Sequence, residues 1–148
     1  MIRFAAAAAA AALLLTAAPA LAQSADNKVV LTFETGARTG MVMVALYDTA
    51  RAFNGEGPNA DANRAVARTA ISASGRVVAT FDNLPAGDYA VKAFHDVNGD
   101  GEMNTNPFGM PTEPYAFSNN AVGNMGPARW DRAHFAVSGE TAQTISIR

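Results

Sequence analysis

From residue 28 onward the chain is a series of short runs in which apolar and polar residues alternate. In the run 28–35, Val29, Leu31 and Phe33 occupy every second position. A period of two places successive side chains on opposite faces of a β-strand. Gly, Asn and Pro separate the runs and favour turns, and no long helical pattern occurs between them. This pattern restricts the chain to an all-β architecture.

The same reasoning predicts seven strands, at 28–35, 41–48, 64–72, 76–81, 87–96, 133–138 and 142–147. The run 41–48 is apolar on both faces, which is typical of a central strand covered on two sides or of an apolar face that meets a loop. Residues 48–63 are predicted to form a loop with a short helical turn near 49–53. Seven short strands separated by turns favour a Greek-key β-sandwich.

The first 22 residues have the features of a secretory signal. Arg3 gives a positive start, residues 4–15 form an uninterrupted apolar run, and residues 20–22 make a small-x-small cleavage site. The alternative is an uncleaved membrane anchor, but the apolar run is shorter than the roughly 20 residues that a bilayer-spanning helix needs. We therefore expect a cleaved leader, one domain over residues 23–148, and a periplasmic or secreted location.

Composition excludes several function classes. The chain has no cysteine, which removes disulfides, thiolate metal sites and cysteine nucleophiles. Without the leader it carries ten basic and thirteen acidic residues, a net charge of −3. Nucleic acids and anionic membrane surfaces bind clustered Lys and Arg, so neither is an expected partner. No nucleophile elbow, phosphate loop, dinucleotide fingerprint or zinc-protease motif occurs, so we do not expect an enzyme.

Residues 97–130 have no clear strand or helix pattern, although a structureless segment of this length is uncommon inside a compact domain. The segment is rich in Pro and Gly, so disorder is one interpretation. It also holds Phe108, Tyr115, Phe117 and Trp130 and few charges, whereas disordered segments are usually charged and poor in aromatic residues. We therefore expect one long ordered loop of the Ω type with buried rings, ending where Trp130 begins the next strand.

Residues 81–91, FDNLPAGDYAV, resemble the signature of transthyretin-like and collagen-binding-B-like sandwiches. In those proteins a Leu-Pro-x-Gly turn joins two strands and a tyrosine opens the second. Pro85 presets φ near about −65°, and Gly87 is expected to supply the unusual backbone angle of the turn. Leu84 and Tyr89 would then pack across the corner.

A larger set of segments resembles the exported bacterial domain-of-unknown-function family numbered 2141. These segments follow one another along nearly all of residues 23–148. They are GMVMVALYD at 40–48, LPAGDYA at 84–90, HDVNGDG at 95–101, GMPTEPYAFSNN at 109–120 and AHF at 133–135. The resemblance implies an exported β-sandwich and supplies no activity.

Residues 96–104 have the spacing of the first part of a calcium-binding loop. In an EF-hand loop, positions 1, 3 and 5 supply side-chain oxygens, glycine turns the chain at 6, and position 7 supplies a backbone carbonyl. Here Asp96, Asn98 and Asp100 take the first three of those positions, and Gly101 takes the turn. The Ca²⁺ ligands that this spacing predicts are Asp96, Asn98, Asp100, Glu102 and Asn104.

The calcium hypothesis leaves alternatives open. Position 12 is Pro107 instead of the usual bidentate glutamate, so another residue, such as Glu113, would have to fold back. A turn without metal is the main alternative, because Asn98-Gly99 and Asp100-Gly101 are both strong turn dipeptides. The third alternative is a cation other than Ca²⁺. Without any cation the three carboxylates of the segment would repel one another, which favours a metal.

Aromatic and amide side chains after this segment form a second candidate site. Rings could contact a partner and amides could hydrogen bond to it, or the rings could close over the sandwich while the amides satisfy loop backbone groups. The candidate residues are His95, Phe108, Tyr115, Phe117, Asn119 and Asn120. For His95 a hydrogen-bonded core position is favoured over a role beside Asp96, because it shares a strand face with Tyr89 and Val91.

These observations predict a non-catalytic binding or accessory module at the cell envelope, whose partner is a protein, peptide or small ligand. The second hypothesis is a small-ligand carrier with a pocket between sandwich and loop. The third is a hydrolase that uses His95, Asp96 and Glu102. A pocket lined by rings would favour the carrier, a filled surface the interaction module, and carboxylates converging with His95 in a cleft the enzyme.

Overall fold

The computed structural model describes residues 26–36, 39–56 and 64–148. The predicted leader and its cleavage site lie outside these residues, as does part of the predicted 48–63 loop. Eight strands are seen: β1 Asn27–Glu34, β2 Met41–Tyr47, β3 Ala67–Ser72, β4 Arg76–Leu84, β5 Gly87–Asp96, β6 Tyr115–Phe117, β7 Phe135–Val137 and β8 Glu140–Ser146. The short helices are α1 Ala50–Asn54, the 3-10 turn η2 Ser118–Asn120, and α2 Trp130–Ala133. The protein is all-β, as the alternating runs predict.

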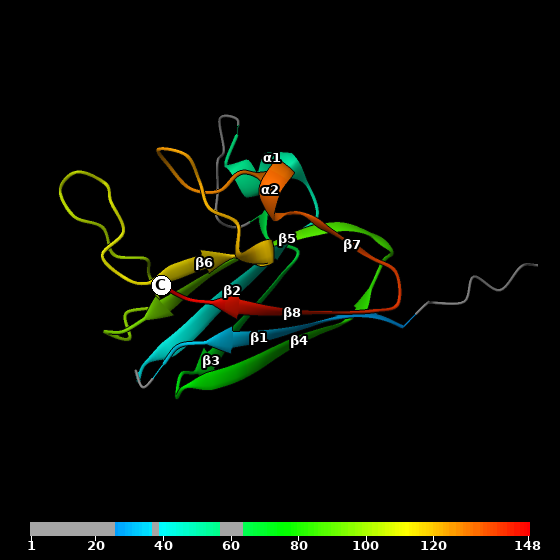
Figure 1. Cartoon of the computed structure of the whole chain (residues 1–148), viewed down its shortest axis with the longest axis horizontal. Coiled ribbons are helices and arrows are strands. Elements are labelled where there is room, and N and C mark those ends of the chain that lie inside the picture. Colours follow the sequence, from blue (N-terminus) through cyan, green and yellow to red (C-terminus); the bar gives the residue numbers. More distant parts are fainter. Residues whose placement is uncertain (1–25, 37–38, 57–63) are drawn as a thin grey trace, which may run out of the picture.

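The strands form two sheets (Figure 1). One has the order β4-β1-β8, in which β1 pairs antiparallel with β4 and parallel with β8. The other has the order β3-β2-β5-β6, and β7 pairs with the beginning of β5. β6 is an eighth strand that lies inside the segment predicted to be one long loop. No helix in the described part of the chain is long and apolar enough to cross a membrane.

The main core fills the space between the two sheets. β1 contributes Val29, Leu31 and Phe33, which are completely buried, and β2 contributes Val42 and Leu46 from the other sheet. The alternation read from the sequence therefore assigns the inner faces of both strands correctly. Apolar burial between two facing sheets is the main source of stability in such an architecture.

A second apolar cluster covers the outer face of β2 and β5. Phe53, on α1, is completely buried at its centre, with its ring 5.6 Å from Tyr47, 6.1 Å from Phe117 and 6.0 Å from Trp130. The two short helices α1 and α2 lie side by side over this face (Figure 1). This cluster explains why the run 41–48 is apolar on both faces. The helical turn predicted near 49–53 is confirmed as α1.

The turn between β4 and β5 contains a hydrogen bond from the Tyr89 hydroxyl to the Pro85 carbonyl, 2.8 Å long. Tyr89 packs in the main core, and Leu84 lies against the same cluster. The expectation for Gly87 is wrong, because its φ is not positive; the residue with a positive φ nearby is Asn83, at 56°, close to the end of β4. Asparagine tolerates the left-handed region better than other residues with a side chain.

We expect Tyr89→Phe to lower the free energy of unfolding by about 1 kcal/mol, because it removes one hydrogen bond and leaves the ring in place. The Pro85 carbonyl is at the exposed side of the turn and regains a water, which limits the loss. Urea denaturation followed by circular dichroism measures the change. A variant as stable as the parent would show that the hydroxyl contributes nothing to the corner.

Candidate functional site

Residues 96–104, which we call the acidic loop, begin at the last residue of β5. The Asp96 side chain is buried, with 1% of its surface exposed. Its carboxylate accepts the backbone N–H of Gly99 at 2.7 Å and that of Gly101 at 2.8 Å. Both glycines have a φ near 80°, a conformation that a residue with a side chain adopts at a cost. The chain is therefore wound around one buried carboxylate.

The next two predicted ligands repeat this local pattern. Asn98 Oδ1 accepts the N–H of Asp100 at 3.1 Å, and Asp100 Oδ1 accepts the N–H of Glu102 at 2.9 Å. Asp100 Oδ2 also accepts the amide groups of Asn98, at 3.0 Å, and Asn104, at 2.8 Å. These hydrogen bonds, the one from Asn104 foremost, lower the pKa of Asp100 from its ordinary value. Asp100 therefore remains a carboxylate at neutral pH.

Glu113 folds back onto the acidic loop. Its carboxylate is buried and accepts the N–H of Val97 at 2.8 Å and that of Asn104 at 3.2 Å. One side chain thus bridges the beginning and the end of the loop. Glu113 is the example that the sequence interpretation gave of a residue that would fold back in place of the missing glutamate at position 12, and it does fold back onto the loop.

The acidic loop gathers a set of oxygen atoms of mixed chemistry. Among the described residues no three His, Cys, Asp or Glu side chains form a group that could hold a metal ion, so a cation here would need amide and backbone oxygens as well. Ca²⁺ accepts such mixed sets of about 6–8 oxygens. Two amide nitrogens, from Asn98 and Asn104, now donate to Asp100. Rotating these amides by half a turn would present oxygen instead.

Glu102 differs from the other predicted ligands. Its side chain is exposed, while its backbone N–H is held by Asp100. At position 7 of a calcium loop the backbone carbonyl is the ligand, so the carboxylate of Glu102 is not needed.

His95 lies on the inner face of β5, opposite to Asp96. It is completely buried, and its Nε2 is 2.7 Å from the Thr39 carbonyl oxygen, while Nδ1 is buried without a hydrogen-bond partner. Adjacent residues of a strand point to opposite faces, so the imidazole and the Asp96 carboxylate do not converge. The arrangement is that of a core histidine and not that of an acid–base pair.

The chain after the acidic loop makes a small hairpin at 105–111, which we call the first tip. Thr105 and Pro111 form an antiparallel bridge across its base. The side-chain oxygen of Asn106 accepts the N–H groups of Phe108 and Met110, both at 3.0 Å. Phe108 is 90% exposed and Met110 is 61% exposed. The first tip is therefore built by internal hydrogen bonds and presents apolar side chains to solvent.

The other candidate rings divide between surface and core. Tyr115 is 39% exposed, whereas Phe117 is buried in the second cluster. The prediction that Phe117 contacts a partner, and that rings such as Phe108 are buried, is corrected accordingly. Trp130 does not begin a strand but begins α2, where its ring stacks on His134 at 5.6 Å.

The amides of Asn119 and Asn120 are engaged within the protein. Asn120 donates to the Thr144 carbonyl at 3.0 Å and accepts the Ser146 N–H at 2.9 Å, so its amide takes the place of a paired strand along the edge of β8. Asn119 donates to the carbonyls of Arg132 and His134. Both asparagines therefore satisfy backbone groups of loops and strands. This is the alternative in which the amides hold the loop instead of binding a partner.

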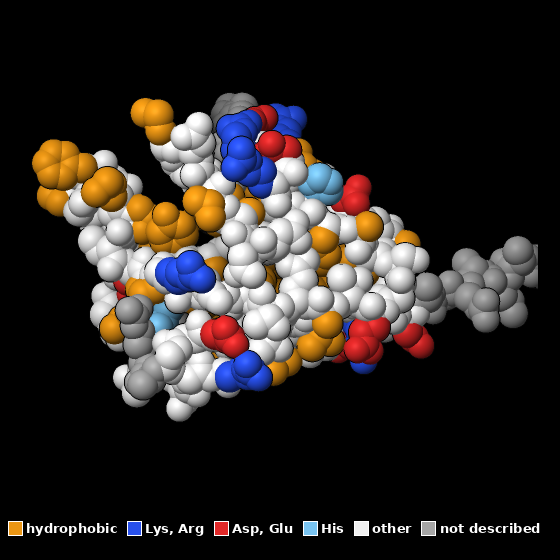
Figure 2. All heavy atoms as spheres, in the orientation of Figure 1, with side chains coloured by type: hydrophobic (Ala, Val, Ile, Leu, Met, Phe, Trp, Pro, Cys, Tyr) orange, Lys and Arg blue, Asp and Glu red, His pale blue; other side chains and the backbone are white. Residues whose placement is uncertain are grey.

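A second apolar projection, missed in the sequence, is the loop 121–128, which we call the second tip. Met125 is fully exposed, at 102%, and Val122 is 72% exposed. Figure 2 shows hydrophobic side chains on two projections and on the hollowed surface between them. An open groove of about 620 Å³ runs beside the first tip. Its lining residues are Val97, Pro111, Thr112, Glu113, Pro114, Tyr115 and Arg148.

The two sheets define an all-β protein in which the acidic loop follows the end of β5. A family model described as "Uncharacterized protein conserved in bacteria (DUF2141)" matches residues 34–146, and the chain belongs to this family. The matched residues include the acidic loop and both tips. The family expected from the sequence segments is thus confirmed. No curated protein and no solved structure matches the chain.

Proposed function

We propose that this protein is a non-catalytic exported β-sandwich module that binds a partner at the cell envelope and whose acidic loop is stabilised by Ca²⁺. The leader in the sequence supports a periplasmic or secreted location. The corner at Tyr89 supports a scaffold of the Greek-key, transthyretin-like type. The observation that carries the calcium proposal is the position of Glu113, whose carboxylate completes the loop from outside its sequence.

The proposed ligand set combines carboxylates with neutral oxygens. Asp96, Asp100 and Glu113 supply the negative charge, and Asn98, Asn104 and the Glu102 carbonyl supply neutral oxygens. A cation bound at the loop would offset the repulsion among these negative charges. Because hard oxygen ligands prefer Ca²⁺ over transition metals, calcium is the cation that this chemistry fits best.

We expect Ca²⁺ to raise the melting temperature of the chain lacking residues 1–22, compared with the same protein in a chelator. A ligand at about a hundredfold excess over its Kd adds about 2.7 kcal/mol, which corresponds to roughly 10 °C for a domain of this size. Asp100→Ala is expected to remove the increase, and Mg²⁺ serves as the comparison cation. Identical melting curves of the parent in calcium and in chelator would refute the calcium proposal.

The small-ligand carrier remains the second candidate. The observation that favours it is the groove beside Val97 and Tyr115, which joins apolar surface to the polar Arg148. The groove is open, whereas carrier sites usually bury most of their ligand. Its surface therefore fits an extended partner better than an enclosed small molecule.

A further inference from the structure

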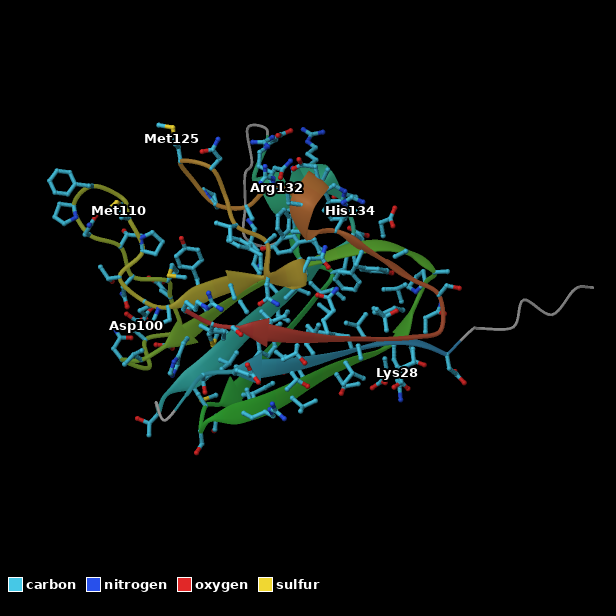
Figure 3. All side chains as sticks on the ribbon, in the orientation of Figure 1. Lys28, Asp100, Met110, Met125, Arg132 and His134 are labelled. Carbon is cyan, nitrogen blue, oxygen red and sulfur yellow. The ribbon has the colours of Figure 1, made fainter. Side chains whose placement is uncertain are left out.

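The two tips share three properties. The first tip, residues 105–111, and the second tip, residues 121–128, contain no charged side chain. They carry the two most exposed large apolar side chains among the described residues, Met125 at 102% and Phe108 at 90%. They also project on the same side of the molecule, as the positions of Met110 and Met125 show (Figure 3). Soluble proteins seldom gather large apolar side chains in this way without a partner.

The exposure of both tips is built into their backbones. In the first tip, one amide of Asn106 holds the N–H groups on either side of Gly109. In the second tip, Met125 has a φ of 57°, an uncommon conformation for a residue with a long side chain. Gly123 approaches the Gly126 carbonyl so closely that a Cβ would lie 1.7 Å from its oxygen. The backbone is thus shaped to hold Met125 outward.

We propose that both tips insert into the boundary between headgroups and acyl chains of a phospholipid bilayer. This names the partner of the binding module and therefore rests on the proposed function. A fluid bilayer surrounds two separate projections without needing matching sockets, and it accepts Phe, Met and Pro but penalises charge. The tips carry no charged side chain, and charged residues lie behind them.

Two arginines close to the tips suit lipid phosphates, whereas Asp100 and Glu102 of the acidic loop, beside the first tip, do not. Arg132 contacts the base of the second tip, where its Nη1 lies 3.5 Å from the Val122 carbonyl oxygen. Arg148 lines the groove beside Tyr115, next to the first tip. Two arginines are too few to form the dense cluster of Lys and Arg by which proteins bind an anionic surface. The chain is acidic overall, so the apolar tips supply the main attraction and a zwitterionic surface suffices.

The test is flotation of the leader-free protein with vesicles of pure phosphatidylcholine. We expect the parent to float with the vesicles. Each polar substitution at a tip should weaken partitioning about tenfold, so the double variant F108S/M125S should lose about a hundredfold. The matched control is Val78→Ser, which removes an exposed valine from β4, on the other sheet. It should float like the parent.

A second readout reports depth. Phe108→Trp places an indole at the first tip, and its emission should shift to shorter wavelength when vesicles are added, relative to the parent with Trp130 alone. Failure of the parent to float, flotation of F108S/M125S at the parental level, or an unshifted indole would each overturn the proposal. So would a dimer that this double variant dissociates, because the tips would then serve a second copy of the chain.

The outcome is separable from the calcium proposal. If the melting temperature rises in calcium but the protein does not float with vesicles, the calcium proposal stands and the bilayer proposal fails. If the protein floats equally in calcium and in chelator, and its melting temperature does not change, the bilayer proposal stands and the calcium proposal fails.

Discussion

Gly40→Ala is expected to lower the free energy of unfolding by about 3 kcal/mol, equivalent to roughly 10 °C in melting temperature. A Cβ at this position would lie 2.4 Å from the Asp96 carbonyl oxygen and 3.2 Å from His95 Nε2. Asp96 cannot retreat easily, because it pairs with Met41 in the ladder between β2 and β5. The φ of Gly40, 116°, adds strain for any residue with a side chain.

Gly36→Ala is the matched control. Gly36 also has a positive φ, 66°, but a Cβ there would meet no heavy atom within 4 Å. Its replacement therefore carries the backbone cost alone, about 1 kcal/mol. Chemical denaturation of both variants, followed by circular dichroism, separates the two contributions. Equal losses would show that the contact with the beginning of the acidic loop contributes nothing to the effect of Gly40→Ala.

The long strands were predictable because their signal is local. β1, β2 and β5 alternate over seven to ten residues, so their inner faces follow from the period of two. β6 has only three residues and exists because it pairs with β5, with Lys92 opposite Phe117. No pattern within three residues can reveal such a partner. The predicted count of seven strands therefore fell one short.

The helix α2 was hidden for a similar reason. Its four residues are too few for a helical period, and the N–H of Trp130 is held by the side chain of Asn54, 76 residues earlier in the chain. That contact joins α1 to α2, and the Trp130 side chain packs against the second cluster. A segment that the alternation assigned to one strand at 133–138 is accordingly the end of a helix followed by β7.

The candidate site divides in the same way. The winding of the acidic loop was predictable, since Asp96, Asn98 and Asp100 hold neighbouring N–H groups. The sequence did not predict which rings face solvent, because Phe108 and Phe117 look alike in sequence and differ only in what packs on them. A useful signal was the lack of charge in residues 105–111 and 121–128, because charged residues are mostly found on the surface.

Glu113→Ala is expected to lower the free energy of unfolding by about 2–3 kcal/mol. The change removes the charged acceptor of the Val97 and Asn104 N–H groups, and a hydrogen bond to a charged group contributes about 1.5–3 kcal/mol. Under the calcium proposal it also removes a ligand, so calcium should no longer raise the melting temperature. Thermal melting in calcium and in chelator measures both effects on one sample.

Two further variants separate the structural role of Glu113 from its charge. Glu113→Gln keeps an acceptor oxygen for one N–H, so it should recover part of the stability but not the response to calcium. Glu102→Ala removes a carboxylate from the same loop whose side chain is exposed, and it should preserve both. A calcium response that survives Glu113→Gln but disappears in Glu102→Ala would place the ion on the exposed side of the loop, away from the buried carboxylate that joins its two ends.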